Sequence, residues 1–315
     1  MEAASVQAGT PGRRRSRGLS ERRLAALMVT PSLALIALVA AYPIGYAIWL
    51  SLHDYSVVNP GLSRWAGSFG LRNYTDALWG PTSAEFWSAV RVTFEFTVAS
   101  VILETLLGLA MALAMHSAFK GQGLLRTVVL VPWAVLTVVT AIMRQTIFDP
   151  TLGFVNSVFG SIGLPDDTVW LGSQPEALIV LVIADVWKTA PFMALLLLAG
   201  LQVIPGDIYE AAKVDGATAW QRFVKITLPL LRPALLVALI FRTLDALRIF
   251  DLPFVLTKGA QDTRTLSLYA YQEFQTNNIF GYGSALAVLT FIIVMLVSFL
   301  YIRFVGGNIR GLAED

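Results

Sequence analysis

Residues 210–217 read Glu-Ala-Ala-Lys-Val-Asp-Gly-Ala, and Leu228-Pro229 follows further along the chain. This stretch is polar and helix-forming, a glycine interrupts it, and it lies between two long apolar segments. A loop that only connects two apolar segments could be shorter and less structured. We therefore predict that this part of the chain is shaped to fit another protein.

The composition of the chain indicates a membrane protein. Of its 315 residues, 56% are hydrophobic and only 14% are charged, whereas soluble domains carry about 25% charged residues. The chain has no cysteine, which excludes a disulfide framework, a cysteine-ligated zinc and an iron–sulfur cluster. The formal net charge of +2 says little, because in a membrane the placement of charge matters more than its sum.

Six apolar stretches are long enough to cross a bilayer, which takes about 20 mostly apolar residues in a helix. Lipid offers no partner to free backbone groups, so each span must be helical, and we expect an all-α integral membrane protein. The run from 24 to 50 is far longer than the apolar core of a signal peptide, about 7–15 residues, which favours an uncleaved span. The predicted spans are 24–50, 88–115, 124–148, 177–201, 233–256 and 283–305.

Lysine and arginine in the flanking segments predict the orientation, because they are enriched on the cytoplasmic side. With the N-terminus inside, the cytoplasmic segments hold Arg13, Arg14, Arg15, Arg17, Arg22, Arg23, Lys120, Arg126, Lys213, Arg222, Lys225, Arg232, Arg303 and Arg310. The outer segments hold only Arg64, Arg72, Lys258 and Arg264. Both termini are therefore expected in the cytoplasm.

The spans and charges predict four parts of the chain. Residues 1–23 form a basic cytoplasmic tail, 24–87 hold the first span and an outer loop, 88–305 form the main transmembrane domain, and 306–315 form a second cytoplasmic tail. The outer loops carry Trp65, Trp79, Trp87 and Trp170. These tryptophans favour an aromatic belt at the membrane interface, and docking of an outer partner is the alternative.

The long cytoplasmic loop, residues 202–232, is expected to begin with a short helix. Asp207 can cap it, with Glu210 as its capping-box partner three residues on. Gly216 can end it in a left-handed backbone conformation. Small side chains at Ala211 and Ala212 permit close approach by a partner. An amphipathic helix that rests on lipid headgroups is the alternative interpretation.

A second short helix is expected to follow Gly216. Thr218 and Gln221 repeat the capping-box spacing, and the helix should run through Ile226. Pro229 should stop it, because proline cannot continue a helix. Pro233 should then begin the fifth span. The loop is thus predicted to be two short helices joined at Gly216.

These residues resemble a known family. The stretch from Glu210 to Pro229 is similar to the EAA loop of permease subunits from binding-protein-dependent ABC importers. The resemblance extends over about residues 90–305 and to the first span. Motifs of the sugar-importing branch occur at 41–44, 250–257 and 281–285, although Lys258-Gly259-Ala260 departs from that branch. The segments 186–193 and 241–251 most resemble permeases of mycobacterial trehalose importers.

The resemblance implies a type I ABC importer permease fold with six transmembrane helices and a cytoplasmic coupling helix. It implies a permease subunit that translocates a sugar, such as the disaccharide trehalose, across the cytoplasmic membrane of a bacterium. Its implied partners are a second permease subunit, two ATPase subunits that bind ATP and Mg²⁺, and an outer sugar-binding protein. The implied ATPase-coupling residues are Glu210, Ala211, Ala212, Asp215, Gly216, Ala217, Leu228 and Pro229.

Ionisable residues inside the predicted spans are costly and mark function or pairing. In the fifth span Arg242, Asp245, Arg248 and Asp251 recur every three residues, a spacing at which neighbours meet on a helix. They predict either a self-neutralising ladder that braces the spans or a polar cavity for sugar hydroxyls. The candidate substrate-pathway residues are Trp187, Lys188, Arg242, Asp245, Arg248, Phe250 and Asp251.

Other charges in the spans suggest further pairs. Asp185 and Lys188 form one expected pair, and Arg144 lies near Asp149. The second span offers Glu95 and Glu104 as possible partners of Arg144 or of the fifth-span arginines.

The chain lacks the motifs of an enzyme. It has no Gly-x-x-x-x-Gly-Lys-[Ser/Thr] phosphate loop, so ATP should be bound by a partner, and no His-Glu-x-x-His or Gly-x-Ser-x-Gly motif. His53 and His116 fall at opposite membrane faces, so no joint metal site is expected. No nucleic acid is expected as a partner. The rival functions are a secondary transporter or channel that works alone, and a membrane scaffold without transport.

Overall fold

The computed structural model describes residues 21–57, 69–117, 120–163, 165, 167–172, 174–260 and 262–305, and this part of the chain contains helices and no strand. By its contacts the chain divides into two units, residues 1–47 and residues 48–315. The expectation of an all-α protein is confirmed. The predictions that fall on residues 1–20, on 58–68 with Arg64 and Trp65, and on 306–315 with Arg310 lie outside the described residues.

The first unit consists of most of α1 (Glu21–Ser51). The part of α1 from Leu24 to Ser51 is long and apolar enough to cross a membrane. This helix confirms the first predicted span. Pro31 and Pro43 lie inside it.

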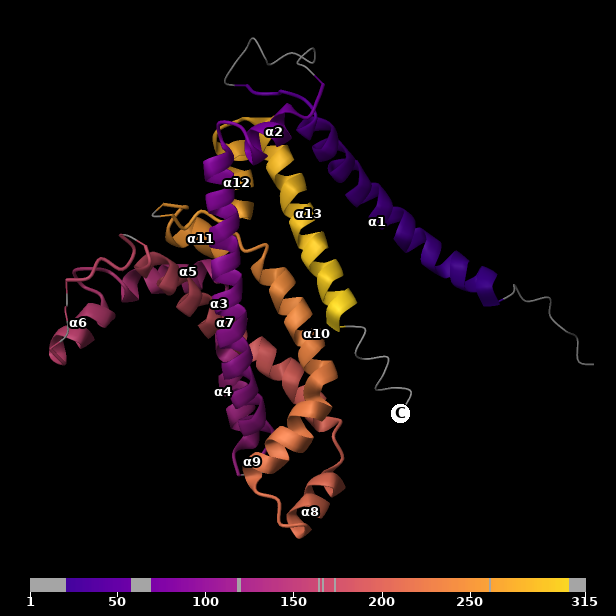
Figure 1. Ribbon diagram of the computed structural model, residues 1–315, viewed down its shortest axis with the longest axis vertical. Coiled ribbons are helices and arrows are strands. Elements are labelled where there is room, and N and C mark those ends of the chain that lie inside the picture. The colour runs from indigo at the N-terminus through magenta and orange to yellow at the C-terminus, as the bar shows by residue number, and fades with distance from the viewer. Residues whose placement is uncertain are drawn as a thin grey trace, which may run out of the picture. The chain divides into compact units, whose positions relative to one another are not determined.

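The second unit is organised around three long helices. α3 (Ser83–His116) packs along α7 (Glu176–Gln202), and α10 (Leu228–Ala246) packs against both (Figure 1). The close approach of α7 and α10 needs a glycine at position 200. A Cβ added at Gly200 on α7 would lie 2.3 Å from the Cβ of Ala234 on α10. α13 (Phe280–Val305) packs on α12 (Leu266–Tyr271) and on α10.

Several of the shorter elements lie near the two ends of this unit (Figure 1). α8 (Gly206–Val214) and α9 (Ala219–Arg222) lie together at one end, and α12 lies near the other (Figure 1). Further short elements are α2 (Arg72–Leu78), α6 (Phe154–Ser161) and the π-helix η2 (Gln272–Thr276).

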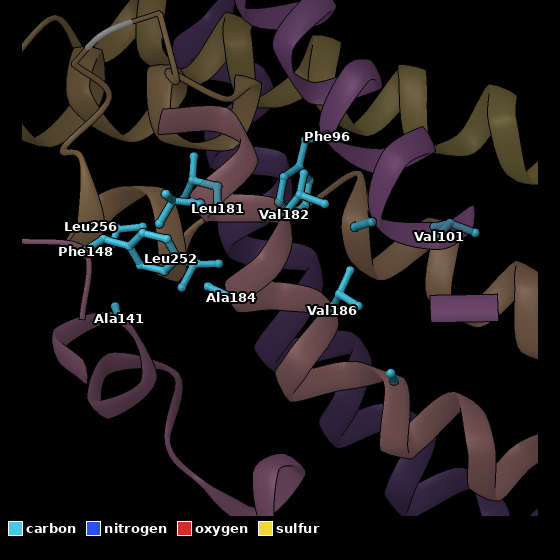
Figure 2. Close-up of a cluster of buried hydrophobic side chains, with 13 residues drawn as sticks. Phe96, Val101, Ala141, Phe148, Leu181, Val182, Ala184, Val186, Leu252 and Leu256 are labelled. Carbon is cyan, nitrogen blue, oxygen red and sulfur yellow. The ribbon is translucent and has the colours of Figure 1, made fainter. Parts of the chain in front are cut away.

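A buried apolar cluster joins α7 to its neighbours. Leu181 and Val186 of α7 lie in it with Phe96 of α3 (Figure 2). Leu252 adds α11 (Asp251–Leu256), and Phe148 adds the end of α5 (Thr137–Ile147). Each fully buried side chain of this size contributes roughly 1.5–3 kcal/mol where it leaves water.

The third predicted span is not one straight helix. α4 (Gln122–Ala134) and α5 are inclined at 88° to each other, so the expected continuous helix 124–148 is wrong. The break follows Pro132, which lacks an N–H and disturbs the preceding turn. Val135 and Leu136 then take extended ψ values of 136° and 140°. If the bent pair counts as one span, the described residues hold up to six candidate spans, and otherwise five.

The fifth span begins earlier than predicted and is interrupted. α9, the π-helix η1 (Phe223–Thr227) and α10 follow one another directly, and α10 ends at Ala246 before α11 begins. Pro229 does not stop the helix, because it lies in the first turn of α10, where a missing N–H is tolerated. Pro233 lies inside α10 rather than at its start. The predicted span 233–256 lies within the candidate span Ala219–Leu256, which begins earlier, and its helix is interrupted between Ala246 and Asp251.

Candidate functional site

The cytoplasmic loop contains the two predicted helices, but the first begins differently. α8 starts at Gly206, its N-cap is Pro205, and no side chain caps it by a hydrogen bond. The predicted cap by Asp207 is therefore wrong. Pro205 has an extended ψ of 135°, which places Asp207 inside the first turn, where a carboxylate interacts favourably with the helix dipole.

The junction between the helices matches the prediction. Gly216 has a φ of +78°, and its N–H donates to the carbonyl of Lys213 at 3.1 Å. Thr218 Oγ1 accepts from the N–H of Gln221 at 3.2 Å, and the Gln221 side chain accepts from the N–H of Thr218 at 2.8 Å. Both the left-handed glycine and the second capping box are confirmed.

The surface of this loop is largely exposed. None of the residues of α8, all of which the structure describes, is buried. Glu210, Ala211, Asp215 and Gly216 are exposed, whereas Ala212, Ala217, Leu228 and Pro229 are half-buried. The large apolar side chains of Val214 and Trp220 are also exposed.

A charge cluster ties the three long helices together. The side chains of Arg242 on α10, Glu104 on α3 and Asp185 on α7 are 2%, 0% and 6% exposed. The Arg242 guanidinium donates to both Glu104 oxygens, at 2.9 Å from Nη2 to Oε1, and to Asp185 Oδ2. Thr189 Oγ1 also donates to Glu104. The suggested pairing of Glu104 with a fifth-span arginine is confirmed.

The predicted ladder along the fifth span is wrong. Arg242 does bind Asp245, with Nη1 2.8 Å from Oδ2. Because α10 ends at Ala246, Arg248 lies beyond the helix and donates to the carbonyl of Leu244 at 3.1 Å, and Asp251 starts α11. The remaining two charges therefore cannot continue the i, i+3 series.

Two other predicted pairs are also wrong. Asp185 binds Arg242 rather than Lys188. Arg144 lies over the ring of Trp187, 4.8 Å from the centroid, a cation–π arrangement. Asp149 instead accepts from the backbone of Leu152 and from Thr151, and these hydrogen bonds lower the pKa of its carboxyl.

The suggested pairing of Glu95 with Arg144 or with the fifth-span arginines is wrong. Glu95 lies 3.9 Å from Arg91 on its own helix. This spacing gives an exposed i, i+4 pair, which is a weak interaction.

A cavity of about 300 Å³ lies beside the charge cluster. Its lining residues are Trp133, Thr189, Phe192, Phe241, Arg242, Asp245 and Arg248. The rings of Trp133 and Phe192 stack with centroids 5.8 Å apart and planes inclined at 13°. The Asp245 side chain is 71% exposed, so the buried Arg242 holds a carboxylate that faces the cavity.

Only three of the seven candidate pathway residues line this cavity. Trp187 lines a separate apolar cavity of about 420 Å³ between α3, α4 and α7. Phe250 packs on Phe254 and Tyr271, with ring centroids 5.2 and 4.9 Å away. Trp133 was missed, although its place directly after Pro132 could have marked it as lying at a helix break.

The described residues contain no group of three or more His, Cys, Asp or Glu side chains that could hold a metal ion. A carboxylate, guanidinium groups and a stacked aromatic pair can bind a molecule with hydroxyl groups on an apolar frame.

Comparisons with known proteins give a consistent family. Residues 104–310 match the profile described as "Binding-protein-dependent transport system inner membrane component". The trehalose transport system permease protein SugA of Mycobacterium tuberculosis is 43% identical over 293 residues, 93% of this chain and 92% of that protein. The trehalose/maltose transport system permease protein MalF of Thermococcus litoralis is 43% identical over 285 residues, 90% of this chain and 94% of that protein.

A more distant relative and a solved structure agree with these matches. The sulfoquinovosyl glycerol transport system permease protein SmoG of Agrobacterium fabrum is 37% identical over 289 residues, covering 91% of this chain and 92% of that protein. A chain of a bacterial alginate ABC transporter, in complex with an alginate-bound periplasmic protein, superposes with a TM-score of 0.76. It covers 89% of this chain and 93% of that chain at 20% identity, so this likeness concerns the fold.

Proposed function

Because this chain belongs to the family of inner membrane components of binding-protein-dependent transport systems, we propose that it translocates a disaccharide, with trehalose the first candidate. The chain is a permease subunit of an ABC sugar importer, with a multi-pass all-helical fold, and it is not itself an enzyme. ATP is bound by partner ATPase subunits.

The cavity beside Arg242 is the observation that carries the sugar proposal. Sugars present hydroxyl groups around an apolar ring face. The Asp245 carboxylate can accept hydrogen bonds from hydroxyls, and the Arg248 guanidinium can donate them. The stacked rings of Trp133 and Phe192 can contact an apolar ring face. Two relatives that are both 43% identical, one named for trehalose and one for trehalose and maltose, support trehalose as the first candidate.

The cytoplasmic loop is proposed as the element that couples transport to ATP. Glu210, Ala211 and Ala212 would lie against an ATPase subunit, and Glu210 would meet a basic or donor group there. Two ATPase subunits, a second permease subunit and an outer sugar-binding protein would complete the transporter. ATP-driven closure of the ATPase pair would move α8 and tilt the helices, so that the cavity opens alternately outward and inward.

We expect both termini in the cytoplasm, which single cysteines can test because the natural chain has none. Leu152, which is 91% exposed, lies in a predicted outer loop, and the exposed Lys120 lies in a predicted inner one. A membrane-impermeant maleimide should label Leu152→Cys in intact cells and Lys120→Cys only after permeabilisation. The reverse labelling would contradict the proposed orientation.

The substrate proposal predicts how the complete transporter responds to a panel of sugars. Trehalose should stimulate ATP hydrolysis by the complex with its binding protein, whereas monosaccharides should leave it near the basal rate. Asp245→Asn should raise the trehalose concentration for half-maximal stimulation about tenfold, because a hydrogen bond to a charged group contributes about 1.5–3 kcal/mol.

Asp251→Asn is the matched control, because Asp251 is exposed and does not line the cavity. It should leave the response unchanged. A flat response to trehalose with a clear response to another disaccharide would remove the trehalose assignment. A response to no sugar at all would contradict sugar transport.

A further inference from the structure

The orientation of α8 is not fixed by packing. None of its residues is buried, and nothing lies within 4 Å of a Cβ built on Gly216, where α8 turns into α9. In the connection to α7, Val203 is exposed and Ile204 packs against a buried apolar cluster, so the connection holds only the start of α8. A helix held so loosely would not transmit a displacement unless specific contacts attach it to the long helices.

A side-chain hydrogen bond attaches α8 to the residue that directly precedes α10. The Tyr209 hydroxyl of α8 lies 3.0 Å from Oγ1 of Thr227. Thr227 is the last residue of η1, directly before α10, and only 5% of its surface is exposed. The other acceptor near Thr227 Oγ1 is the Arg222 carbonyl, at the longer distance of 3.5 Å. The hydroxyl pair is therefore a partly buried hydrogen bond between α8 and the base of α10.

The opposite end of α10 is held at the cavity. Arg242 is bound there by Glu104 and Asp185, about 22 Å along the helix from Thr227 at 1.5 Å per residue. Thr243, the next residue, lies 3.0 Å from the Tyr301 hydroxyl of α13. A tyrosine–threonine hydroxyl pair thus lies near each end of α10, one joined to α8 and one to α13.

We infer that the Tyr209–Thr227 hydrogen bond makes α8 and α10 move as one body, so that Tyr209 is a positioning residue for coupling. The inference rests on the proposed coupling role of the loop. Without this bond α8 can still meet an ATPase, but its displacement is absorbed at Gly216 and at the α7–α8 connection. The helix that lines the cavity then follows the ATPase less closely.

The test is the ratio of trehalose imported to ATP hydrolysed by the complete transporter in vesicles. Tyr209→Phe and Thr227→Val each remove one hydroxyl and keep the shape of the side chain. Each should lower this ratio about fivefold, the factor that corresponds to a typical net hydrogen-bond contribution. ATPase co-purification and the rate of ATP hydrolysis should stay near those of the natural protein. Thr227→Ser, which keeps the hydroxyl, should leave the ratio near that of the natural protein.

Tyr301→Phe is the matched control, because it breaks the hydroxyl pair at the other end of α10. It should leave the ratio near that of the natural protein. The inference is overturned if Tyr209→Phe leaves the ratio unchanged, if Tyr301→Phe lowers it equally, or if Tyr209→Phe loses the ATPase on purification. A natural complex that imports no trehalose would contradict the proposed function itself, and this inference with it.

Discussion

Replacing Arg242 with methionine should strongly destabilise the permease and abolish transport. The change would leave Glu104 and Asp185 buried without their common cation. Removing one partner of a buried charge pair costs roughly 3–5 kcal/mol, because the remaining charge is uncompensated. The thermal midpoint of the purified complex should fall markedly, and trehalose uptake into vesicles should fall to background.

Two further variants make this expectation specific. Arg248→Met removes an exposed guanidinium with one hydrogen bond to a backbone carbonyl, so the midpoint should hardly change. Combining Arg242→Met with Glu104→Gln and Asp185→Asn should recover much of the lost stability, because neutral groups tolerate burial better than unpaired charges. An unchanged midpoint for Arg242→Met would show that the cluster does not hold α3, α7 and α10 together.

The charge cluster shows where local sequence spacing fails. The i, i+3 spacing of Arg242, Asp245 and Arg248 predicts a ladder on one helix, but the end of α10 at Ala246 removes the helix on which the ladder depends. The buried partners Glu104 and Asp185 are 138 and 57 residues away in sequence. Glu104 could be suggested because few acids lie in the spans, but no local pattern distinguishes it from Glu95.

The prolines also show that local sequence alone does not predict where a helix bends. Pro132 precedes the 88° break between α4 and α5, whereas Pro229 and Pro233 lie within α10. Pro229 is tolerated because it lies in the first turn of α10, whereas Pro132 and Pro233 both lie inside helices. Packing of the neighbouring helices decides whether the chain bends or continues, and single-sequence reasoning does not contain that packing.

Sequence reasoning predicted correctly the features that depend only on residues close together in the chain. The left-handed Gly216 and the Thr218–Gln221 capping box involve residues within a few positions of each other, and both were predicted. The apolar length of the spans also predicted the all-α membrane class, because lipid leaves few alternatives. The aromatic pair of Trp133 and Phe192 was missed, since it joins two helices distant in sequence.

Gly216→Pro should uncouple the transporter. Gly216 has a φ of +78°, whereas the proline ring fixes φ near −65°, and the substitution also removes the N–H that bonds to Lys213. The chain must then leave α8 in another direction. We expect ATPase co-purification to weaken and uptake to fall to background. Gly216→Asn should keep most of both, because asparagine tolerates the left-handed conformation and the space around the glycine is open.

ATP-driven trehalose uptake into vesicles tests the central claim, that this permease is driven by an ATPase docked on the loop around Gly216. Complete complexes with the natural chain or with Gly216→Asn should accumulate trehalose only when ATP is supplied to the ATPase side. Complexes with Gly216→Pro, and the permease subunits alone, should not accumulate it. Uptake by the permease subunits alone on an ion gradient, or undiminished uptake with Gly216→Pro, would contradict the account.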